Sequence, residues 1–295
     1  MVYDVNGNII CDYDGGGGGS YTEQECITAF MQAANKKAAS IGMTNSNFAS
    51  PSGASISAQT TAADMALLTM IASCYKELAE VWSKDSYTVV PRNRSASIVL
   101  STTVHDTTLE ASYPILGGKT GSYLGHSALA CVCNVGNKQV AGYVAEASSD
   151  AARFAAMKEL MDIAATILDG GTTTATVTSA ANAVAILVPN YYTLNYEQQT
   201  PVTLYSQSGT TSIVPASTAK LITALTVLDW VYDINQTYTY TQSDYDVGGS
   251  GRVFQVGDVV SFKDGLYALM LPSSNMTAHA FARVVGRKIL NNQNG

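Results

Sequence analysis

The sequence has few residues of the kinds that build disulfide frameworks or metal sites. It contains five cysteines and three histidines among 295 residues, and no pair of them has the spacing of a zinc site. Cys131 and Cys133 alternate on one expected strand, at a spacing too long for a relaxed disulfide. We expect Cys26, Cys74, Cys131 and Cys133 to be small core residues, and the sequence predicts neither a metal nor any other cofactor.

Long apolar runs and excess positive charge are also absent. No apolar run approaches the length that crosses a membrane, and no charged segment followed by an apolar one opens the chain. The 16 lysines and arginines are outnumbered by 23 aspartates and glutamates, which gives a net charge of -7. The basic residues are scattered, so nucleic-acid binding is disfavoured. We expect no transmembrane segment, no signal peptide and no nucleic-acid partner.

Apolar residues are nevertheless numerous enough for a large core. They make up 46% of the chain, as expected of one domain with two lobes. Residues 1–20 differ in character, because Asn6-Gly7 between two short apolar runs predicts a hairpin. Five glycines and a serine follow at Gly15–Ser20 as a flexible linker, whose plainest explanation is engineering. Residues 1–20 are therefore either an appended hairpin or a rebuilt loop.

The first chemical signal lies in the stretch Ile213–Leu225. Ser217 and Lys220 are three residues apart at the start of an apolar helix, so they share one face. Lys220 can then take the proton of the Ser217 hydroxyl, provided that burial lowers the pKa of the amine. Pro215 and Ala216 are expected to form an extended lead into the helix, whose free first-turn N–H groups can face an oxyanion.

The Ser-x-x-Lys pattern is weak evidence by itself. It is expected roughly once by chance in a chain of this length, and Ser73 and Lys76 also fit it. They lie within a helix expected over about residues 61–82, where a serine is most simply solvated or bonded to the backbone. Ser217 therefore needs support from other segments.

Two further motifs supply that support. Ser273 and Asn275 form Ser-x-Asn between a short helical segment and a second amphipathic helix. Lys119–Gly121 is a Lys-Thr-Gly motif, expected to open a strand that continues to Val135. Each motif alone is modest evidence or none. Together, at a helix start, an inter-helix turn and a strand edge, they indicate one catalytic site.

With these three motifs, the chain resembles the penicillin-recognising serine enzymes, in detail the D-alanyl-D-alanine carboxypeptidases. The resemblance covers most of the chain from Tyr21 onward. Residues 257–270 resemble the family segment that leads into Ser-x-Asn. Family segments that normally lie between the second and third motifs are matched by residues 35–43, 47–53 and 61–66.

The order of the motifs departs from that of the family, in which Lys-Thr-Gly comes last. We therefore expect a circular permutant, opened between Gly295 and Tyr21. Its parts are the family's carboxy-terminal portion at 21–168, a connector at 169–180 and the amino-terminal portion at 181–295, with 21–295 as one catalytic domain. The implied fold is α/β (α+β) and β-lactamase/transpeptidase-like, with an antiparallel sheet flanked by helices plus an all-helical lobe.

The resemblance implies an acyl-enzyme mechanism on peptidoglycan stem peptides that end in D-Ala-D-Ala. Ser217 attacks the carbonyl of the penultimate D-alanine, and Lys220 accepts its proton. The backbone N–H groups of Ser217 and Ser122 form the oxyanion hole. Ser273 relays the proton to the leaving amine, and Asn275 holds the substrate amide and Lys220. β-Lactams are then covalent inhibitors.

The resemblance also implies that Thr120, Gly121 and Ser122 bind the substrate. Lys119 supplies positive potential, and the Thr120 hydroxyl bonds the terminal carboxylate. No arginine near this motif is evident in the sequence to assist carboxylate recognition. His126 is expected to be a polar residue at a strand end.

Two other functions stay open. A β-lactamase-type hydrolase would turn penicillins over rapidly, but the chain has no stretch resembling the one that supplies the deacylating carboxylate in class A enzymes. A non-enzymatic scaffold or display fusion is favoured by the motif order and the glycine linker. The resemblance places the parent protein outside the bacterial cytoplasm, secreted or attached to the cell wall, so a missing signal peptide indicates a trimmed or rebuilt chain.

Periodicity predicts the surrounding elements. Thr22 and Glu25 form a capping box for a helix closed by Gly42, and Asp150 caps another long helix. Residues 170–180, rich in Gly, Thr, Ala and Ser, are expected to form a connector. Strands are predicted over residues 97–103, 119–135, 139–146, 183–188 and 193–205.

Overall fold

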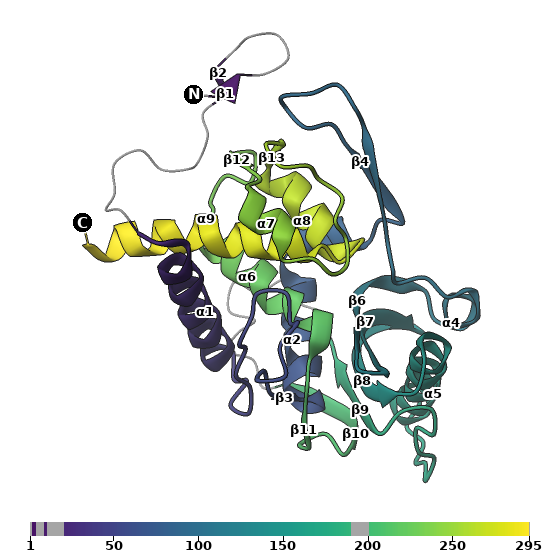
Figure 1. The fold of residues 1–295 in the computed structure, drawn as a ribbon. Helices are drawn as coiled ribbons and strands as arrows, with labels where there is room; N and C mark the ends of the chain where they lie inside the picture. The colour runs from purple at the N-terminus through teal and green to yellow at the C-terminus, as the bar shows by residue number, and fades with distance from the viewer. Residues whose placement is uncertain (1, 4–8, 11–20, 190–200, 295) are drawn as a thin grey trace.

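A computed structural model describes residues 2–3, 9–10, 21–189 and 201–294. The chain is a mixed α/β protein with a five-stranded antiparallel sheet flanked by helices, and further helices pack beside the sheet (Figure 1). The coarse prediction of an α/β fold with an antiparallel sheet is therefore confirmed. The predicted Asn6-Gly7 turn, the Gly15–Ser20 linker and the first part of the 193–205 strand lie outside the described residues.

The sheet runs in the order β10-β9-β8-β7-β6, and every neighbouring pair is antiparallel. Side chains alternate between its two faces, as the period of a strand requires. On β7, for example, Ala130 joins the core on one face and Cys131 the core on the other. The strands are β6 (Ile115–Tyr123), β7 (His126–Val135), β8 (Lys138–Ala147), β9 (Asn182–Leu187) and β10 (Val202–Gln207).

The prediction of one strand from Lys119 to Val135 is wrong. A two-residue turn at Leu124 and Gly125, both at positive φ (46° and 85°), ends β6 and begins β7. Two consecutive positive φ values are what a tight hairpin needs, and only the second residue is a glycine. The Lys-Thr-Gly motif therefore lies within β6, the edge strand of the sheet.

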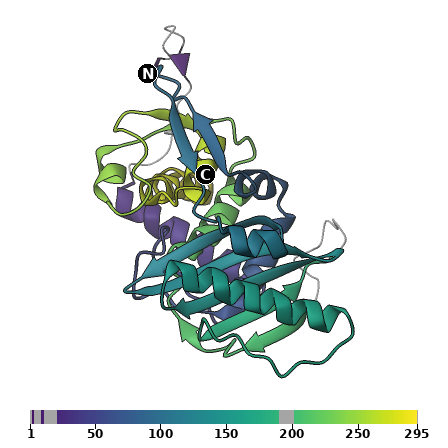
Figure 2. The same cartoon turned by 90° about the vertical axis from the view of Figure 1, so that its right-hand side faces the viewer.

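One helix covers each face of the sheet. Helix α5 (Asp150–Leu168) lies across the outer face, as the turned view in Figure 2 shows, and α2 (Ala62–Cys74) packs against the inner face. The N-cap of α5 is Ser149, which accepts a hydrogen bond from Ala152 N, so the predicted cap at Asp150 is one residue late. Apolar side chains of the outer face and α5 form one core, while those of the inner face are continuous with the helical lobe.

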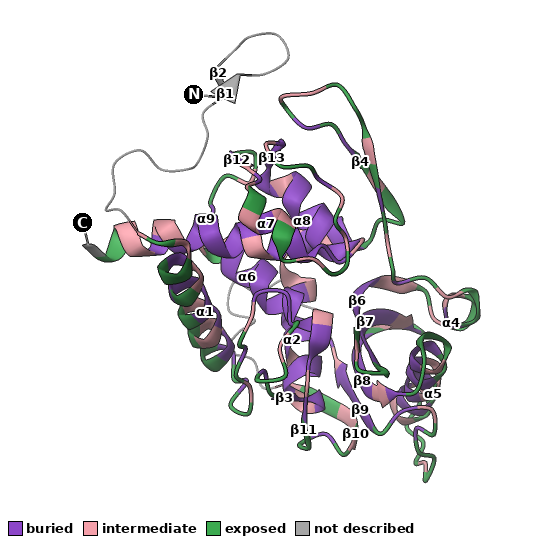
Figure 3. Ribbon diagram, in the orientation of Figure 1, coloured by how far each residue is buried: buried purple, intermediate pink, exposed green. Residues whose placement is uncertain are grey.

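The helical lobe is built around the buried helices α6, α8 and α9 (Figure 3). Helix α1 lies along α9, and the two approach closely because position 286 is a glycine: a Cβ there would lie 1.9 Å from Cys26 O. The predicted capping box of Thr22 and Glu25 is present at the start of α1, which ends at Ser40. The helices are α1 (Glu23–Ser40), α3 (Lys76–Trp82), α6 (Lys220–Trp230), α7 (Gln242–Asp246), α8 (Phe262–Met270) and α9 (Asn275–Asn294).

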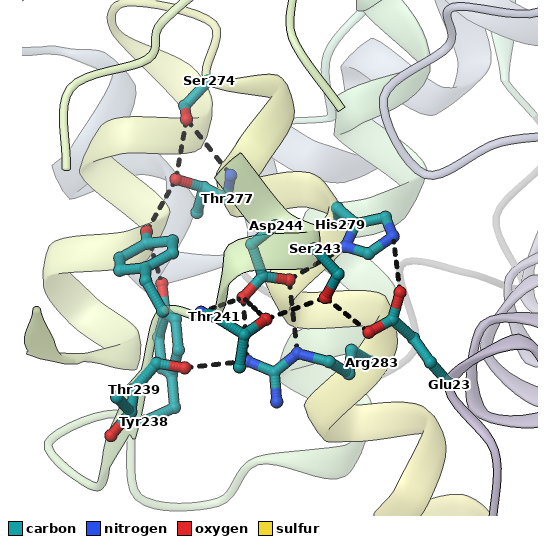
Figure 4. A network of polar contacts seen from close by, with 11 residues as sticks. Glu23, Tyr238, Thr239, Thr241, Ser243, Asp244, Ser274, Thr277, His279 and Arg283 are labelled. Atoms are coloured by element: carbon teal, nitrogen blue, oxygen red, sulfur yellow. Dashed lines mark hydrogen bonds and ion pairs between the residues drawn. The ribbon is translucent and has the colours of Figure 1, made fainter. Parts of the chain in front are cut away.

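A buried polar network ties three of these helices together (Figure 4). The Asp244 carboxylate of α7 contacts His279 at 2.8 Å and Arg283 at 2.9 Å, both on α9. His279 also lies 3.5 Å from Glu23 of α1, and Ser243 donates a 2.5 Å bond to the same glutamate. Burial alone would raise the pKa of Asp244, but the bonds from His279 and Arg283 outweigh it and hold that pKa below its ordinary value.

The single helix predicted over residues 61–82 is wrong. Tyr75 has an extended backbone (φ -81°, ψ 115°) that separates α2 from α3. The break lets Trp82 at the end of α3 lie against Gly117 of β6, where a Cβ would be 2.1 Å from the indole ring. The Ser73 hydroxyl of α2 donates to Met70 O at 2.6 Å, as expected for a serine inside a helix.

Short two-stranded ribbons complete the fold. They pair β1 (Val2–Tyr3) with β2 (Ile9–Ile10), β3 (Thr60–Thr61) with β11 (Ser212–Ile213), β4 (Ser86–Val89) with β5 (Ile98–Ser101), and β12 (Thr237–Thr239) with β13 (Val259–Ser261). Helix α4 (Thr107–Ser112), which the sequence analysis did not predict, follows the β4–β5 hairpin. Among the helices that the structure describes, none is long and apolar enough to span a membrane.

The connector predicted over residues 170–180 has no regular structure, as expected. It is nevertheless held to α5, because the Glu159 carboxylate accepts bonds from the backbone and hydroxyl groups of Thr178 and Ser179. Gln207 of β10 donates to Val177 O at 2.9 Å. The connector thus leads from α5 back to β9 along a fixed path.

Candidate active site

A short 3-10 helix, η2 (Ala216–Ala219), leads directly into α6 and carries Ser217 in its first turn. The predicted extended lead is wrong: Pro215 is helical (φ -69°, ψ -23°) and Ala216 has a φ of 49°. This turn packs tightly on Gly53, where a Cβ would lie 1.8 Å from Ala216 O. The glycine is therefore needed for the approach of the two segments, and Ser217 is left half-buried at the surface of the turn.

Lys220 is the centre of the site. Its Nζ lies 3.0 Å from Ser217 Oγ, 3.0 Å from Ser52 O and 2.7 Å from Asn275 Oδ1. The side chain is fully buried, and burial, followed by the charge of Lys119, holds the pKa of Lys220 well below its ordinary value. Both effects shift the amine toward its neutral form.

The three partners of Lys220 fix the direction of its lone pair. A neutral amine has two N–H donors and one lone pair, and the carbonyl oxygens of Ser52 and Asn275 can only accept. They take both N–H groups. The lone pair is left for Ser217, whose hydroxyl can donate to it, so the geometry is that of a nucleophile with its general base.

Ser273 and Asn275 lie at the turn between α8 and α9. Ser273 has a φ of 63°, and its Oγ is one of three buried side-chain polar atoms without a hydrogen-bond partner in the described part of the chain. The neighbouring loop holds the turn in place, because Asn275 N donates to Ser250 O at 3.0 Å and Ser250 Oγ to Ser273 O at 3.2 Å. The turn thus presents an unpaired hydroxyl two residues from a ligand of Lys220.

The Lys-Thr-Gly motif approaches the same turn from the sheet. A Cβ at Gly121 would lie 3.1 Å from Pro215 O, so β6 runs directly beside η2. Lys119 is fully buried and donates to Thr120 O at 2.9 Å. Burial, followed by the charge of Arg153, lowers the pKa of Lys119 to about 7. The Thr120 hydroxyl is 2.7 Å from that of Thr103.

The prediction that no arginine lies near this motif is wrong. Arg153, in the first turn of α5, is 5% exposed. Its Nη1 donates to Ser122 Oγ at 3.0 Å and to Gly121 O at 3.3 Å, and its Nη2 lies 3.2 Å from Asp150 Oδ1. Its Nε is another of the buried atoms without a partner among the described residues. The sequence did contain a signal for Arg153. A basic residue in the first turn of a helix is unfavourable next to the positive end of the helix dipole, which indicates that another interaction holds it there.

The structure therefore brings the three motifs to one place. Ser217, Lys220 and Asn275 are joined by hydrogen bonds, and the charge of Lys119 acts on Lys220. Ser122 is exposed at the end of β6, within reach of Arg153. Two other residues considered from sequence have partners outside the motifs: Ser73 is bonded within α2, and His126, at the start of β7, pairs with Glu146 at 2.7 Å.

No group of three His, Cys, Asp or Glu side chains in the described ranges is placed to hold a metal ion. Comparisons of the chain with protein-family models, with curated proteins and with solved structures found no match.

Proposed function

We propose that the protein is a serine-type D-alanyl-D-alanine carboxypeptidase that acts through an acyl-enzyme at Ser217. The observation that carries the proposal is the arrangement at Lys220: a fully buried amine with a lowered pKa, two carbonyl acceptors and one hydroxyl at 3.0 Å. A lysine without a catalytic role is most stable when its charged amine is exposed to water. Here burial makes it a base for a single hydroxyl.

In the proposed acylation step, Ser217 Oγ attacks the carbonyl carbon of the penultimate D-alanine while its proton passes to Lys220 Nζ. The oxyanion is held by the backbone N–H groups of Ser217 and Ser122. The unpaired Ser273 hydroxyl then donates a proton to the amine of the leaving D-alanine and receives one from Lys220. Water attacks the ester in the second step, which releases the shortened peptide and restores the Ser217 hydroxyl.

The proposed substrate ends in a carboxylate, and the positive groups beside β6 suit that charge. Lys119 and Arg153 both lie next to Thr120–Ser122, and among the described residues the Nε of Arg153 has no hydrogen-bond partner. A carboxylate bound near Lys119 favours the charged form of that amine and so raises its pKa from about 7. Substrate binding and the protonation of Lys119 are thus coupled.

We infer that the fold is a circularly permuted form of the β-lactamase/transpeptidase-like fold. Support comes from the sheet with one helix on its outer face and the helical lobe beside its inner face (Figures 1 and 2). Further support comes from the Tyr21 hydroxyl, which donates to Leu290 O at 3.3 Å and so links the start of α1 to the end of α9. Joining those ends would need little rearrangement.

A β-lactamase-type hydrolase is the second candidate. Rapid deacylation needs a base that activates water, commonly a carboxylate. In the part of the chain that the structure describes, neither Ser217 nor Lys220 is hydrogen-bonded to a carboxylate. This favours a long-lived penicillin adduct over rapid turnover.

Release of D-alanine from an Nα-acetylated tripeptide ending in D-Ala-D-Ala tests the proposal. The parent protein is expected to release D-alanine, the matched peptide ending in L-Ala-L-Ala is expected to be inert, and Ser217→Ala is expected to be inactive on both. Equal release by Ser217→Ala would overturn the proposal.

A further inference from the structure

The β4–β5 hairpin, residues 86–101, joins the sheet to the helical lobe. It extends from the sheet along that lobe, as Figure 2 shows. The Tyr87 ring stacks on the Tyr267 ring of α8, with 3.6 Å between the ring centres. The Tyr87 hydroxyl also donates to the Asp264 carboxylate at 3.2 Å. The hairpin is therefore attached to the helix that leads into the Ser273 turn.

The tip of the hairpin is attached to the same lobe. Arg94 donates two hydrogen bonds, of 2.5 and 2.8 Å, to the buried Asp258 carboxylate, the planar pairing that suits an arginine and a carboxylate. Asn93 donates to Gly257 O at 2.7 Å and accepts from Val259 N at 3.0 Å. These partners lie just before α8, so both the tip and the first strand of the hairpin are held by the helical lobe.

The base of the hairpin places Thr103 beside the Lys-Thr-Gly strand. Thr102 N donates to Asp85 O at 2.8 Å and closes the base. The Thr102 hydroxyl accepts from Val104 N at 3.1 Å, and Thr103 between them is exposed. The hydroxyl oxygens of Thr103 and Thr120 are 2.7 Å apart, the usual distance for an O–H···O bond. A segment held by the helical lobe is thus bonded to the edge strand of the sheet.

The Thr103 hydroxyl determines what the Thr120 hydroxyl can do. Thr120 is 6% exposed, and among the described residues its hydroxyl is bonded to that of Thr103. A hydroxyl has one proton to donate and two lone pairs that accept. If Thr120 donates to Thr103, it has no proton for a ligand, whereas if Thr103 donates to Thr120, the Thr120 proton is available. A carboxylate can only accept, so it selects the second arrangement.

The other basic group of the motif cannot orient this hydroxyl, because it lies on the opposite face of the sheet. In the register with β7, Thr120 is opposite Leu129 and Lys119 is opposite Ala130. Leu129 belongs to the core of the outer face, and Ala130 to the core of the inner face. Successive residues of a strand point to opposite faces. The orientation of the Thr120 hydroxyl therefore depends on Thr103.

We propose that Thr103 is a positioning residue, which donates its proton to Thr120 and so directs the Thr120 proton toward the carboxylate of the ligand. This rests on the proposed function, in which that carboxylate binds at Thr120. Each hydrogen bond in the row from Thr103 through Thr120 to the carboxylate strengthens the next. The hairpin holds Thr103 in place, so the lobe that carries Ser273 also orients a group on the sheet.

The test compares acylation by benzylpenicillin and by its methyl ester, which has the same β-lactam ring but no carboxylate. The parent is expected to react faster with the acid. Thr103→Val keeps the shape of the side chain without its hydroxyl and is expected to lower the acid-to-ester rate ratio about fivefold, the effect of losing one hydrogen bond. Thr103→Ser keeps the hydroxyl and is expected to retain most of the ratio. A parental ratio in Thr103→Val, or an equal loss in Thr103→Ser, would overturn the proposal.

The neighbouring residue provides a matched control. Thr102 is on the same segment, but its hydroxyl accepts from Val104 N and is not bonded to Thr120. Thr102→Val is therefore expected to keep the parental acid-to-ester ratio. If it lowers the ratio as much as Thr103→Val does, the shape of the segment is responsible, and the role of the Thr103 hydroxyl is wrong.

The rate with the methyl ester separates positioning from a general disturbance of the site. The ester has no carboxylate for Thr120 to bind, so Thr103→Val is expected to leave its acylation rate unchanged. Equal slowing of acid and ester would show a structural effect and overturn the positioning role. If benzylpenicillin fails to label Ser217 in the parent, the proposed function itself is wrong; if it labels Ser217 but the ratio does not respond to Thr103, only the positioning role is wrong.

Discussion

Lys119→Met is expected to make the protein more stable and less active. Lys119 is fully buried, and its pKa is lowered from 10.5 to about 7 by burial and then by the charge of Arg153. At 1.36 kcal/mol per pH unit, keeping this amine buried costs about 5 kcal/mol at pH 7. Methionine has a similar unbranched shape and no charge.

The substitution also removes one interaction, the 2.9 Å bond from Lys119 to Thr120 O, which is worth about 1 kcal/mol. We therefore expect the free energy of unfolding at pH 7 to rise by about 2 to 4 kcal/mol. The pH dependence has a definite sign. Between about pH 7 and 10.5 the unfolded chain binds a proton that the folded chain lacks, so the stability of the parent rises with pH. The Lys119→Met variant lacks this rise. The difference in unfolding free energy between variant and parent therefore narrows to about 1 kcal/mol near pH 9.

Urea unfolding at pH 7 and pH 9, with penicillin acylation rates measured on the same preparations, tests this expectation. Acylation is expected to slow, because the variant no longer attracts a carboxylate-bearing ligand. Lys158→Met is the control: Lys158 is a half-buried surface lysine of α5, paired with Asp162 at 2.9 Å, and its loss should change stability by about 0.5 kcal/mol or less. A Lys119→Met variant that is no more stable than the parent, or whose stability gain does not depend on pH, would show that burial of the Lys119 amine does not destabilise the folded protein.

Two further predictions concern the support of the site and of the helical lobe. Gly53→Ala is expected to cost about 2 kcal/mol or more and to slow acylation, because the new Cβ would lie 1.8 Å from Ala216 O at a φ of 77°; thermal unfolding at parental Tm would contradict this. Asp244→Asn is expected to cost about 3 kcal/mol at pH 7, since it leaves Arg283 and His279 without their buried carboxylate (Figure 4). Because the pKa of Asp244 is held low, the parent loses this stabilisation as the pH falls below about 4, so urea midpoints of parent and variant should converge there and not at neutral pH.

Some contacts between residues that are close in sequence could be predicted from local rules. Ser217 and Lys220 are three residues apart, so their 3.0 Å contact follows from helical spacing alone. The capping box of Thr22 and Glu25 likewise depends only on neighbouring residues. Such features survive into the structure because nothing distant is needed to form them.

Features that depend on distant contacts could not be predicted. The break at Tyr75 has no Gly or Pro to mark it, and the hairpin turn at Leu124 places a bulky residue at positive φ against its intrinsic preference. Arg153 reaches Ser122 only because three antiparallel strands bring the start of α5 beside the end of β6. In each of these positions, tertiary packing overrides local propensity.

Intact-mass measurement after treatment with penicillin tests whether Ser217 is a nucleophile activated by Lys220. The protein is expected to gain the whole mass of one penicillin molecule, and peptide mapping is expected to place the adduct on Ser217. Ser73→Ala, which removes the other Ser-x-x-Lys serine, should retain the adduct, and Ser217→Ala should abolish it. An adduct of the same mass on Ser217→Ala would show that Ser217 is not the nucleophile.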